Sequence, residues 1–168
     1  MALWRVVRIC KAPNRCAKLA AMYQIDVVGA AIIRDGMLLC ALRPPGGPIG
    51  NMWEFAGGKV EPGETHHQAL VREIDEELGV IVQPNALIAR TTLPYPGRLI
   101  TLTTYYCDLI SGVPAATEHA ELRWVPIADL LELDWAPLDV PAVEQIQKDW
   151  LCDVGLRVKA RNDGSGKV

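Results

Sequence analysis

The chain has 168 residues, half of them hydrophobic, and a formal net charge of −3 at pH 7. A chain of this length buries roughly two thirds of its unfolded surface, so a single domain with its own core is expected. The charge balance does not favour a nucleic-acid polymer as partner, and no apolar run reaches the roughly 18 residues of a membrane-spanning helix.

The first 21 residues contain five basic residues and no acidic residue, which leaves a net charge of −8 for the remainder. We expect this segment to be an extension outside the fold, with Met22 as an alternative start of translation. An organelle-targeting segment and a basic arm that contacts substrate or membrane are the alternatives. The domain is expected over residues 22–158, followed by a polar, Gly-rich and frayed tail over residues 159–168.

The five cysteines are scattered along the chain, and no two of them have the spacing of a zinc site. Free thiols are typical of a reducing compartment, so a cytoplasmic protein is expected. The sequence does not distinguish a monomer from a homodimer.

Short strands and turns dominate the first part of the predicted domain. Residues 25–33 are apolar and β-branched, which is typical of a buried strand. The Asp-Gly pair at residues 35–36 favours a hairpin turn that leads into a second strand over residues 37–42. A loop with three prolines and three glycines follows over residues 43–51, and a short strand is predicted at residues 53–55.

The strongest predicted helix covers residues 65–78. Thr65 and Gln68 form a capping-box pattern at its start, and Gly79 stands where a helix usually ends. The buried stripe of this helix repeats every four residues: Leu70, Ile74 and Leu78.

The second half of the domain reads as strands followed by a helix. Two strands are predicted over residues 87–93 and 99–109, on either side of a Pro-Gly turn at residues 96–97. A further strand is predicted over residues 121–125, and a C-terminal helix over residues 140–151.

Three glutamates of the predicted helix stand at positions i, i+3 and i+4 and therefore share one face: Glu73, Glu76 and Glu77. Like charges this close destabilise a helix unless a cation neutralises them. Carboxylate oxygens suit Mg²⁺, with Mn²⁺ as a substitute. Taken alone, the pattern also fits a solvated acidic face, so the surrounding residues decide between the two interpretations.

Those surrounding residues resemble the signature of the Nudix hydrolases. Gly58 is followed at the family's spacing by Glu64, then by Arg72-Glu73-Ile74, Glu76-Glu77 and Gly79-Val80. A match at every fixed position of so short a segment does not arise readily by chance. The physical chemistry agrees with it, because a Gly-rich loop and a helix start both let phosphates approach backbone N–H groups.

The resemblance implies an α+β fold in which a mixed β-sheet is sandwiched between α-helices. It also implies a loop–helix–loop that holds metal ions, and an activated water that attacks a phosphorus of a diphosphate linkage. Under this resemblance the metal ligands are Glu73, Glu76, Glu77 and a backbone carbonyl of Gly57 or Gly58. Glu64 and Arg72 would tie the loop to the helix. The alternative is an ordinary surface ion pair, which would contribute at most about 1 kcal/mol to the stability of the fold.

The chain is more specifically similar to MutT-like nucleoside triphosphate pyrophosphohydrolases, and among these to the CTP pyrophosphohydrolase type. This similarity covers some 130 residues and is carried by residues 39–44 and 53–62. It implies a substrate site that includes Glu54, Phe55, Gly57, Gly58 and two phosphate-contacting cations. These cations are Arg43 and Lys59, although either side chain could instead simply be solvated.

Two acidic residues beyond the signature also match family positions. Glu118 lies six residues before Trp124, where MutT-like enzymes have a glutamate that joins the metal site or helps to activate water. The alternatives are an acid without a role, or Glu121 in its place. Asp139 falls where the family has a base-reading Asn or Asp, and its alternative role is the N-cap of the last helix.

Asp139 also suggests which base is bound. An ionised carboxylate only accepts hydrogen bonds and the cytosine N4 amino group donates them, which favours a cytosine nucleotide. A partly desolvated, protonated carboxyl also donates, which leaves an oxidised purine such as 8-oxo-dGTP open.

The expected function is Mg²⁺-dependent hydrolysis of CTP, dCTP or a modified dCTP to the monophosphate and pyrophosphate. The alternatives are sanitation of oxidised nucleotides, cleavage of another nucleoside diphosphate-linked compound, and a module that binds nucleotides without cleaving them.

Overall fold

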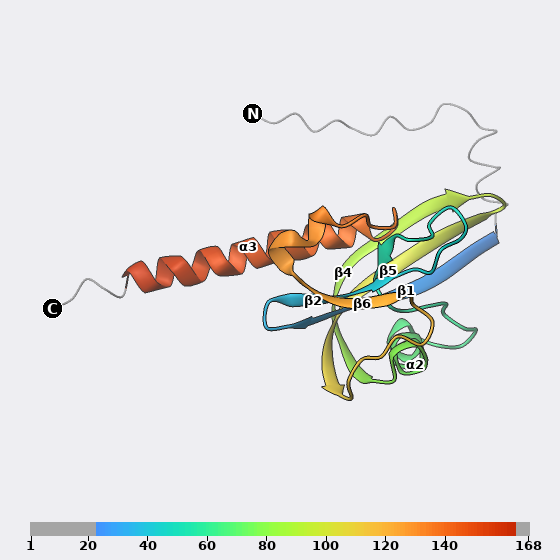
Figure 1. The fold of residues 1–168 in the computed structure, drawn as a ribbon, viewed down its shortest axis with the longest axis horizontal. Helices are drawn as coiled ribbons and strands as arrows, with labels where there is room; N and C mark the ends of the chain where they lie inside the picture. The colour runs from blue at the N-terminus through green and yellow to red at the C-terminus, as the bar shows by residue number, and fades with distance from the viewer. Residues whose placement is uncertain (1–22, 164–168) are drawn as a thin grey trace, which may run out of the picture.

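The structure is a computed structural model that describes residues 23–163 (Figure 1). The extension expected over residues 1–21, its alternative start at Met22 and the last five residues of the expected tail lie outside the described residues.

Within the described residues, the strands form one mixed sheet of six. They are β1 (Tyr23–Arg34), β2 (Met37–Leu42), β3 (Trp53–Glu54), β4 (Ile81–Tyr95), β5 (Arg98–Ser111) and β6 (Glu121–Pro126). The strand order is β3-β2-β1-β5-β4, with β6 paired to β2. Strands β1 and β5 run parallel, whereas the other pairs are antiparallel. The expected mixed sheet is therefore confirmed.

The predicted hairpin between β1 and β2 is also confirmed. Arg34 pairs with Met37, which leaves a two-residue turn. Asp35 and Gly36 both have positive φ, at 52° and 75°. Positive φ at both central positions is the requirement of the turn that best matches the twist of a hairpin, and Asp-Gly meets it at low cost.

The hairpin of β4 and β5 is longer than the sequence pattern predicted. The predicted strands covered residues 87–93 and 99–109, but pairing begins at Ile81 and ends at Ser111. The pairing register shifts between Pro84 and Leu87. A bulge and an internal proline break the alternation of side chains, so the pattern concealed the first part of β4.

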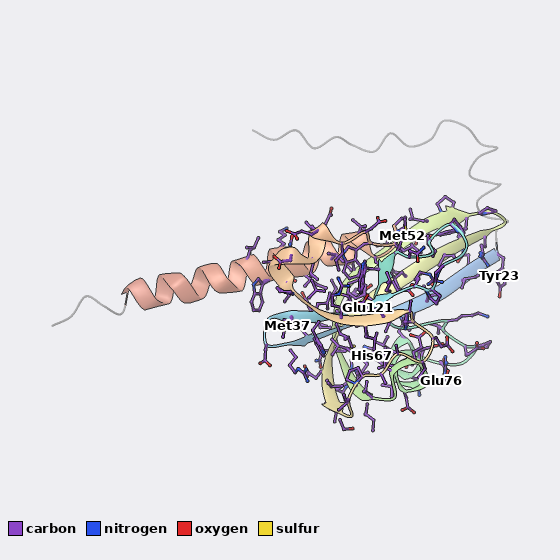
Figure 2. The ribbon with its side chains drawn as sticks, viewed as in Figure 1. Tyr23, Met37, Met52, His67, Glu76 and Glu121 are labelled. Carbon is purple, nitrogen blue, oxygen red and sulfur yellow. The ribbon has the colours of Figure 1, made fainter. Side chains whose placement is uncertain are left out.

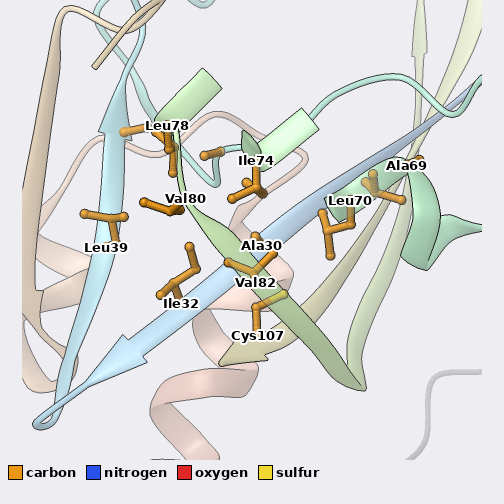
Figure 3. Close-up of a cluster of buried hydrophobic side chains, with 13 residues drawn as sticks. Ala30, Ile32, Leu39, Ala69, Leu70, Ile74, Leu78, Val80, Val82 and Cys107 are labelled. Atoms are coloured by element: carbon orange, nitrogen blue, oxygen red, sulfur yellow. The ribbon is translucent and has the colours of Figure 1, made fainter. Parts of the chain in front are cut away.

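Helix α2 (His66–Leu78) packs on one face of the sheet. Thr65 and Gln68 form the predicted capping box, and Gly79 ends the helix in the left-handed conformation at φ 66°. Its buried side chains are those of the predicted stripe together with Ala69. They lie against residues from β1, β2, β4 and β5 (Figure 3): Ala30, Ile32, Leu39, Val82 and Cys107.

Helix α3 (Val140–Asp163) covers the opposite face (Figure 1). Ala142, Val143 and Ile146 of this helix are buried against a second cluster, which includes Trp53 and Phe55. The short 3₁₀ helix η1 (Ile127–Glu132) joins β6 to this layer. The expected sandwich of a sheet between helices is therefore confirmed.

The predicted end of α3 is wrong. The sequence suggested a helix that stops at residue 151, but α3 continues to Asp163 and projects beyond the sheet (Figure 1). Residues 152–163 contain no proline, so nothing interrupts the backbone hydrogen bonds of the helix. Within residues 23–163, neither helix combines the length and the apolar character needed to cross a membrane.

Candidate active site

The loop between β3 and α2 lies directly on β1. The backbone N–H of Val28 donates to the carbonyl of Gly58 at 2.8 Å. A Cβ atom at Gly57, where φ is 146°, would lie 2.2 Å from the carbonyl oxygen of Val28. A Cβ atom at Gly58 would lie 2.2 Å from a carboxylate oxygen of Glu73. The backbone at position 57 therefore needs glycine, whereas a side chain at position 58 would displace the Glu73 carboxylate, so the loop backbone is in close contact with the acidic face of α2.

Glu77 is the second carboxylate of α2 that contacts this loop. Its Oε2 accepts a hydrogen bond from the backbone N–H of Gly57 at 2.9 Å. Burial raises the pKa of Glu77 to about 7, because desolvation outweighs the hydrogen bond from Gly57 and the charge of His119, both of which lower it. The negative charges of Glu54 and Glu73 raise this pKa further. Negative charge is therefore concentrated beside the glycine loop.

Arg72 joins the loop to α2. Its Nε and Nη2 donate to the two oxygens of Glu64 at 2.8 Å and 3.0 Å, and its Nη1 donates to Glu73 at 2.9 Å. Nη2 also donates to the carbonyl of Lys59 at 3.0 Å. The hydrogen bonds from Arg72 and from the backbone of Glu61 lower the pKa of Glu64 to about 2. One guanidinium therefore fixes the loop against the helix and orients Glu73.

The remaining acidic candidates are more exposed. The side chain of Glu76 is 60% exposed and lies 3.5 Å from Arg72. Its position on α2 is labelled in Figure 2. Glu118 is exposed, but the hydroxyl of the preceding Thr117 donates to the carbonyl of Glu77 at 2.6 Å. The backbone of Glu118 therefore lies beside the end of α2, although its side chain makes no hydrogen bond or ion pair with another described residue.

Between residues 23 and 163, no three acidic, histidine or cysteine side chains form a ready-made metal site. The donor set nevertheless fits a hard divalent cation. Glu77 and Glu73 present carboxylate oxygens beside two successive residues of the loop, Gly57 and Gly58, and such oxygens are the ligands that Mg²⁺ and Mn²⁺ prefer. Burial is the main cause of the raised pKa of Glu77, and a divalent cation would offset the additional repulsion from Glu54 and Glu73.

A cleft of about 450 Å³ opens beside the glycine loop. Six of the predicted substrate-site residues line it: Arg43, Glu54, Phe55, Gly57, Gly58 and Asp139. Lys59, the seventh, is exposed and lies outside the lining, while its backbone pairs with Val27. The cleft thus connects the loop that carries the metal candidates to the start of α3.

Asp139 also lines this cleft and is only 5% exposed. Its Oδ1 accepts the backbone N–H of Phe55 at 3.0 Å, and its other oxygen has no hydrogen-bond partner among the described residues. Burial raises the pKa of Asp139 to about 8, against the lowering effect of the Phe55 hydrogen bond. Pro141 has no N–H and the N–H of Ala142 donates to the backbone carbonyl of Asp139, whereas the carboxyl accepts from Phe55, so the carboxyl does not act as the N-cap of α3.

The structure adds residues to the site that sequence reasoning missed. Tyr95 and Arg98, on either side of the β4–β5 turn, line the cleft, although the sequence indicated only a turn there. Glu54 forms an ion pair with Arg43, and its Oε1 lies 3.3 Å from Nε2 of His119. His119 follows Glu118 directly, but no periodicity or spacing marked it as part of the site.

Comparison with known proteins agrees with this geometry. Residues 23–146 match the NUDIX domain family. The chain is 42% identical over 123 residues to the CTP pyrophosphohydrolase of Escherichia coli, covering 73% of this chain and 91% of that protein. It is 38% identical over 132 residues to putative 8-oxo-dGTP diphosphatase 2 of Mycobacterium tuberculosis, covering 76% and 86%.

One solved structure is also similar to this chain in both fold and sequence. The solution structure of the Escherichia coli ORF135 protein superimposes with a TM-score of 0.69 at 39% identity, covering 77% of this chain and 93% of that one. Enzymes of this family generally depend on a divalent metal ion. On the strength of the family match and these relatives, the chain belongs to the Nudix family and is a nucleotide pyrophosphohydrolase that acts on an acid anhydride.

Proposed function

We propose that this pyrophosphohydrolase cleaves nucleoside and deoxynucleoside triphosphates to the monophosphate and pyrophosphate, with cytosine nucleotides as its preferred substrates. The observation that carries the proposal is the single cleft that joins the glycine loop to Asp139. Its volume of about 450 Å³ lies in the range of small-molecule sites. One end offers groups for phosphates, and the other offers a buried polar group for a base.

At the phosphate end, we assign Glu73, Glu76, Glu77 and the carbonyl of Gly57 as the residues that would hold Mg²⁺ or Mn²⁺. The carbonyl of Gly57 is the better candidate of the two loop carbonyls, because that of Gly58 already accepts Val28 N–H. Glu118 would join this group from the loop beside the end of α2. When bound, the cation polarises phosphoryl oxygens and lowers the pKa of a bound water.

The protein itself positions the phosphate chain. The guanidinium of Arg43 lines the cleft and is held by Glu54, so it can contact phosphate oxygens without losing much side-chain freedom on binding. Arg72 and Glu64 keep the loop and α2 in register. Lys59 could reach a phosphate only from the rim, because its side chain lies outside the cleft lining.

At the base end, Asp139 can pair with cytosine, but as a protonated carboxyl and not as the ionised acceptor expected from the sequence. With a pKa of about 8 the carboxyl is mainly protonated at neutral pH, so it can donate as well as accept hydrogen bonds. The N3–N4 edge of cytosine offers one acceptor and one donor, which a neutral carboxyl can match. The similarity to a CTP pyrophosphohydrolase supports the same preference.

The protonated state of Asp139 also favours a second candidate, which is an oxidised purine such as 8-oxo-dGTP. A guanine edge combines donors with an acceptor, and a neutral carboxyl can pair with both. The similarity to a putative 8-oxo-dGTP diphosphatase supports this alternative.

A substrate panel tests both candidates. Purified protein with Mg²⁺ is assayed against dCTP, 5-methyl-dCTP, CTP and 8-oxo-dGTP, and kcat/KM is compared along with the identity of the products. The proposal expects pyrophosphate as the product and a cytosine nucleotide as the best substrate. Turnover of none of the four would contradict the triphosphatase activity, and a clear preference for 8-oxo-dGTP would select the second candidate.

A further inference from the structure

The side chain of His119 is buried, and its polar contacts are incomplete. Its side chain is only 5% exposed. Nε2 lies 3.3 Å from Oε1 of Glu54, whereas Nδ1 is buried without a hydrogen-bond partner among the described residues. A buried N–H without an acceptor costs free energy, so the favourable arrangement leaves Nδ1 bare and places the proton on Nε2, facing Glu54.

The segment that carries His119 is fastened at both ends. The backbone N–H of Ala115 donates to the carbonyl of Leu78 at 3.1 Å, and Thr117 also bonds to the end of α2. The N–H of Ala120 donates to the carbonyl of Leu42, the last residue of β2, at 2.9 Å. The segment therefore links the metal-binding helix to the strand that precedes Arg43, and it holds the imidazole between them.

Glu54 is the residue that His119 contacts from this segment. Its Oε2 pairs with Nη1 of Arg43, and its Oε1 faces Nε2 of His119. The side chain of Glu54 is 17% exposed, whereas that of Arg43 is 39% exposed and lines the cleft. One carboxylate thus has a separate partner on each oxygen, and only one of those partners can reach a substrate.

We propose that His119 is a positioning residue: by fixing Glu54, it fixes the guanidinium of Arg43 in the orientation that receives the triphosphate. This inference rests on the proposed function. The contact does not depend on the charge of the imidazole, because Nε2 carries a proton in the cation and in the favoured neutral tautomer. The hydrogen bond to Glu54 raises the pKa of His119, which agrees with a close contact between the two groups.

Two substitutions separate positioning from simple packing. The amide nitrogen of glutamine extends about as far as Nε2 of histidine, whereas that of asparagine extends only about as far as Nδ1. His119→Gln should therefore keep KM for dCTP near the wild-type value. His119→Asn should raise KM about tenfold with little change in kcat, because Arg43 contacts the phosphates in both the ground state and the transition state.

His67→Gln is the matched control, because His67 is exposed and contacts Tyr105 outside the cleft. It should leave KM and kcat unchanged. The thermal midpoint of each variant is measured alongside, so that an unfolded variant is recognised. Equal KM values for the Gln and Asn variants would overturn the proposal, and so would a fall in kcat without a rise in KM.

Two further measurements keep the inference separate from the proposed function. If the wild-type protein cleaves no triphosphate, the proposed function fails, and the same Gln and Asn comparison is made on the affinity for α,β-methylene-dCTP. The ¹H–¹⁵N correlation spectrum of the histidine rings should show a proton on Nε2 of His119 in the wild-type protein. A neutral ring protonated only on Nδ1 would overturn the proposal, whatever the activity.

Discussion

Asp139, which directly precedes α3, accepts a hydrogen bond from the backbone N–H of Phe55, which lies 84 residues earlier in the chain. This bond joins the helix on one face of the sheet to the strand that leads into the glycine loop. It also holds an acidic side chain in a position where burial raises its pKa to about 8. An acid that is costly to ionise and lines a cleft is a strong candidate for a recognition group.

Asp139→Asn should stabilise the protein at neutral and alkaline pH. The pKa of Asp139 is about 8 in the folded protein and 3.8 in the unfolded chain, so between these values the unfolded chain loses its proton first. The free energy of unfolding of the wild type therefore falls as pH rises from about 4 to about 8. Asparagine does not ionise and can still accept the Phe55 hydrogen bond. Urea denaturation at pH 5 and pH 8 measures the effect, and a variant less stable than the wild type at pH 8 would contradict it.

Asp139→Asn should also make the selectivity between nucleotide substrates independent of pH. In the wild type, the ratio of kcat/KM for dCTP to that for 8-oxo-dGTP should change as pH passes through about 8, because Asp139 loses its donor there. In Asp139→Asn the ratio should stay constant between pH 7 and pH 9. Parallel pH profiles of the two proteins would show that Asp139 does not read the base.

Gly57→Ala should mainly lower the stability of the protein, whereas Gly58→Ala should mainly lower its activity. A methyl group at Gly57 meets the backbone oxygen of Val28 in a left-handed conformation, so about 1–3 kcal/mol of stability should be lost. A methyl group at Gly58 meets the end of the Glu73 side chain, which can turn away, so activity should fall at least about tenfold while the thermal midpoint changes little. Thermal unfolding and kcat of both variants provide the check; equal losses of stability would refute this distinction.

Arg72→Lys should lower kcat about tenfold to a hundredfold, because a lysine ammonium cannot reproduce the planar fork that serves Glu64, Glu73 and the carbonyl of Lys59 together. Steady-state kinetics at saturating Mg²⁺ measures the loss. Arg123→Lys is the matched control, since Arg123 pairs only with the nearby Glu121 among the described acids. Wild-type kcat in the Arg72 variant would show that the charge alone suffices.

Metal dependence should reside in the acidic face of α2. A chelator should abolish activity, and either Mg²⁺ or Mn²⁺ should restore it. Mg²⁺ should raise the thermal midpoint of the wild type but not that of Glu77→Gln, which should fold normally and lose about 10²–10⁴ in rate. Glu144→Gln, an exposed residue of α3, should behave like the wild type. An equal rise in the midpoint of both Glu variants with Mg²⁺ would place the metal elsewhere.

The features predictable from the sequence were those set by local chemistry. The capping box at Thr65, the left-handed Gly79 and the Asp-Gly turn each depend on a few adjacent residues, and all three form as expected. The acidic face of α2 followed from helical periodicity alone. The end of α3 was not predictable in this way, because its last turns extend past the sheet (Figure 1).

The missed parts of the site depend on contacts between distant segments. His119 meets Glu54 only because its segment is fastened to both α2 and β2. Tyr95 and Arg98 reach the cleft because β5 pairs with β1, which brings Arg98 opposite Tyr23. Neither contact can be recognised from a spacing of residues in the sequence, since both are set by the order of strands in the sheet.

The parallel pairing of β1 with β5 has a consequence for how the protein folds. It joins segments that are separated by the whole signature loop and α2, and closing so long an interval is entropically slow. Val28 of β1 and Leu102 of β5 both line the cleft. Before these strands meet, the cleft lacks part of its lining, so nucleotide affinity during refolding is expected to appear only after this long-range pairing has formed.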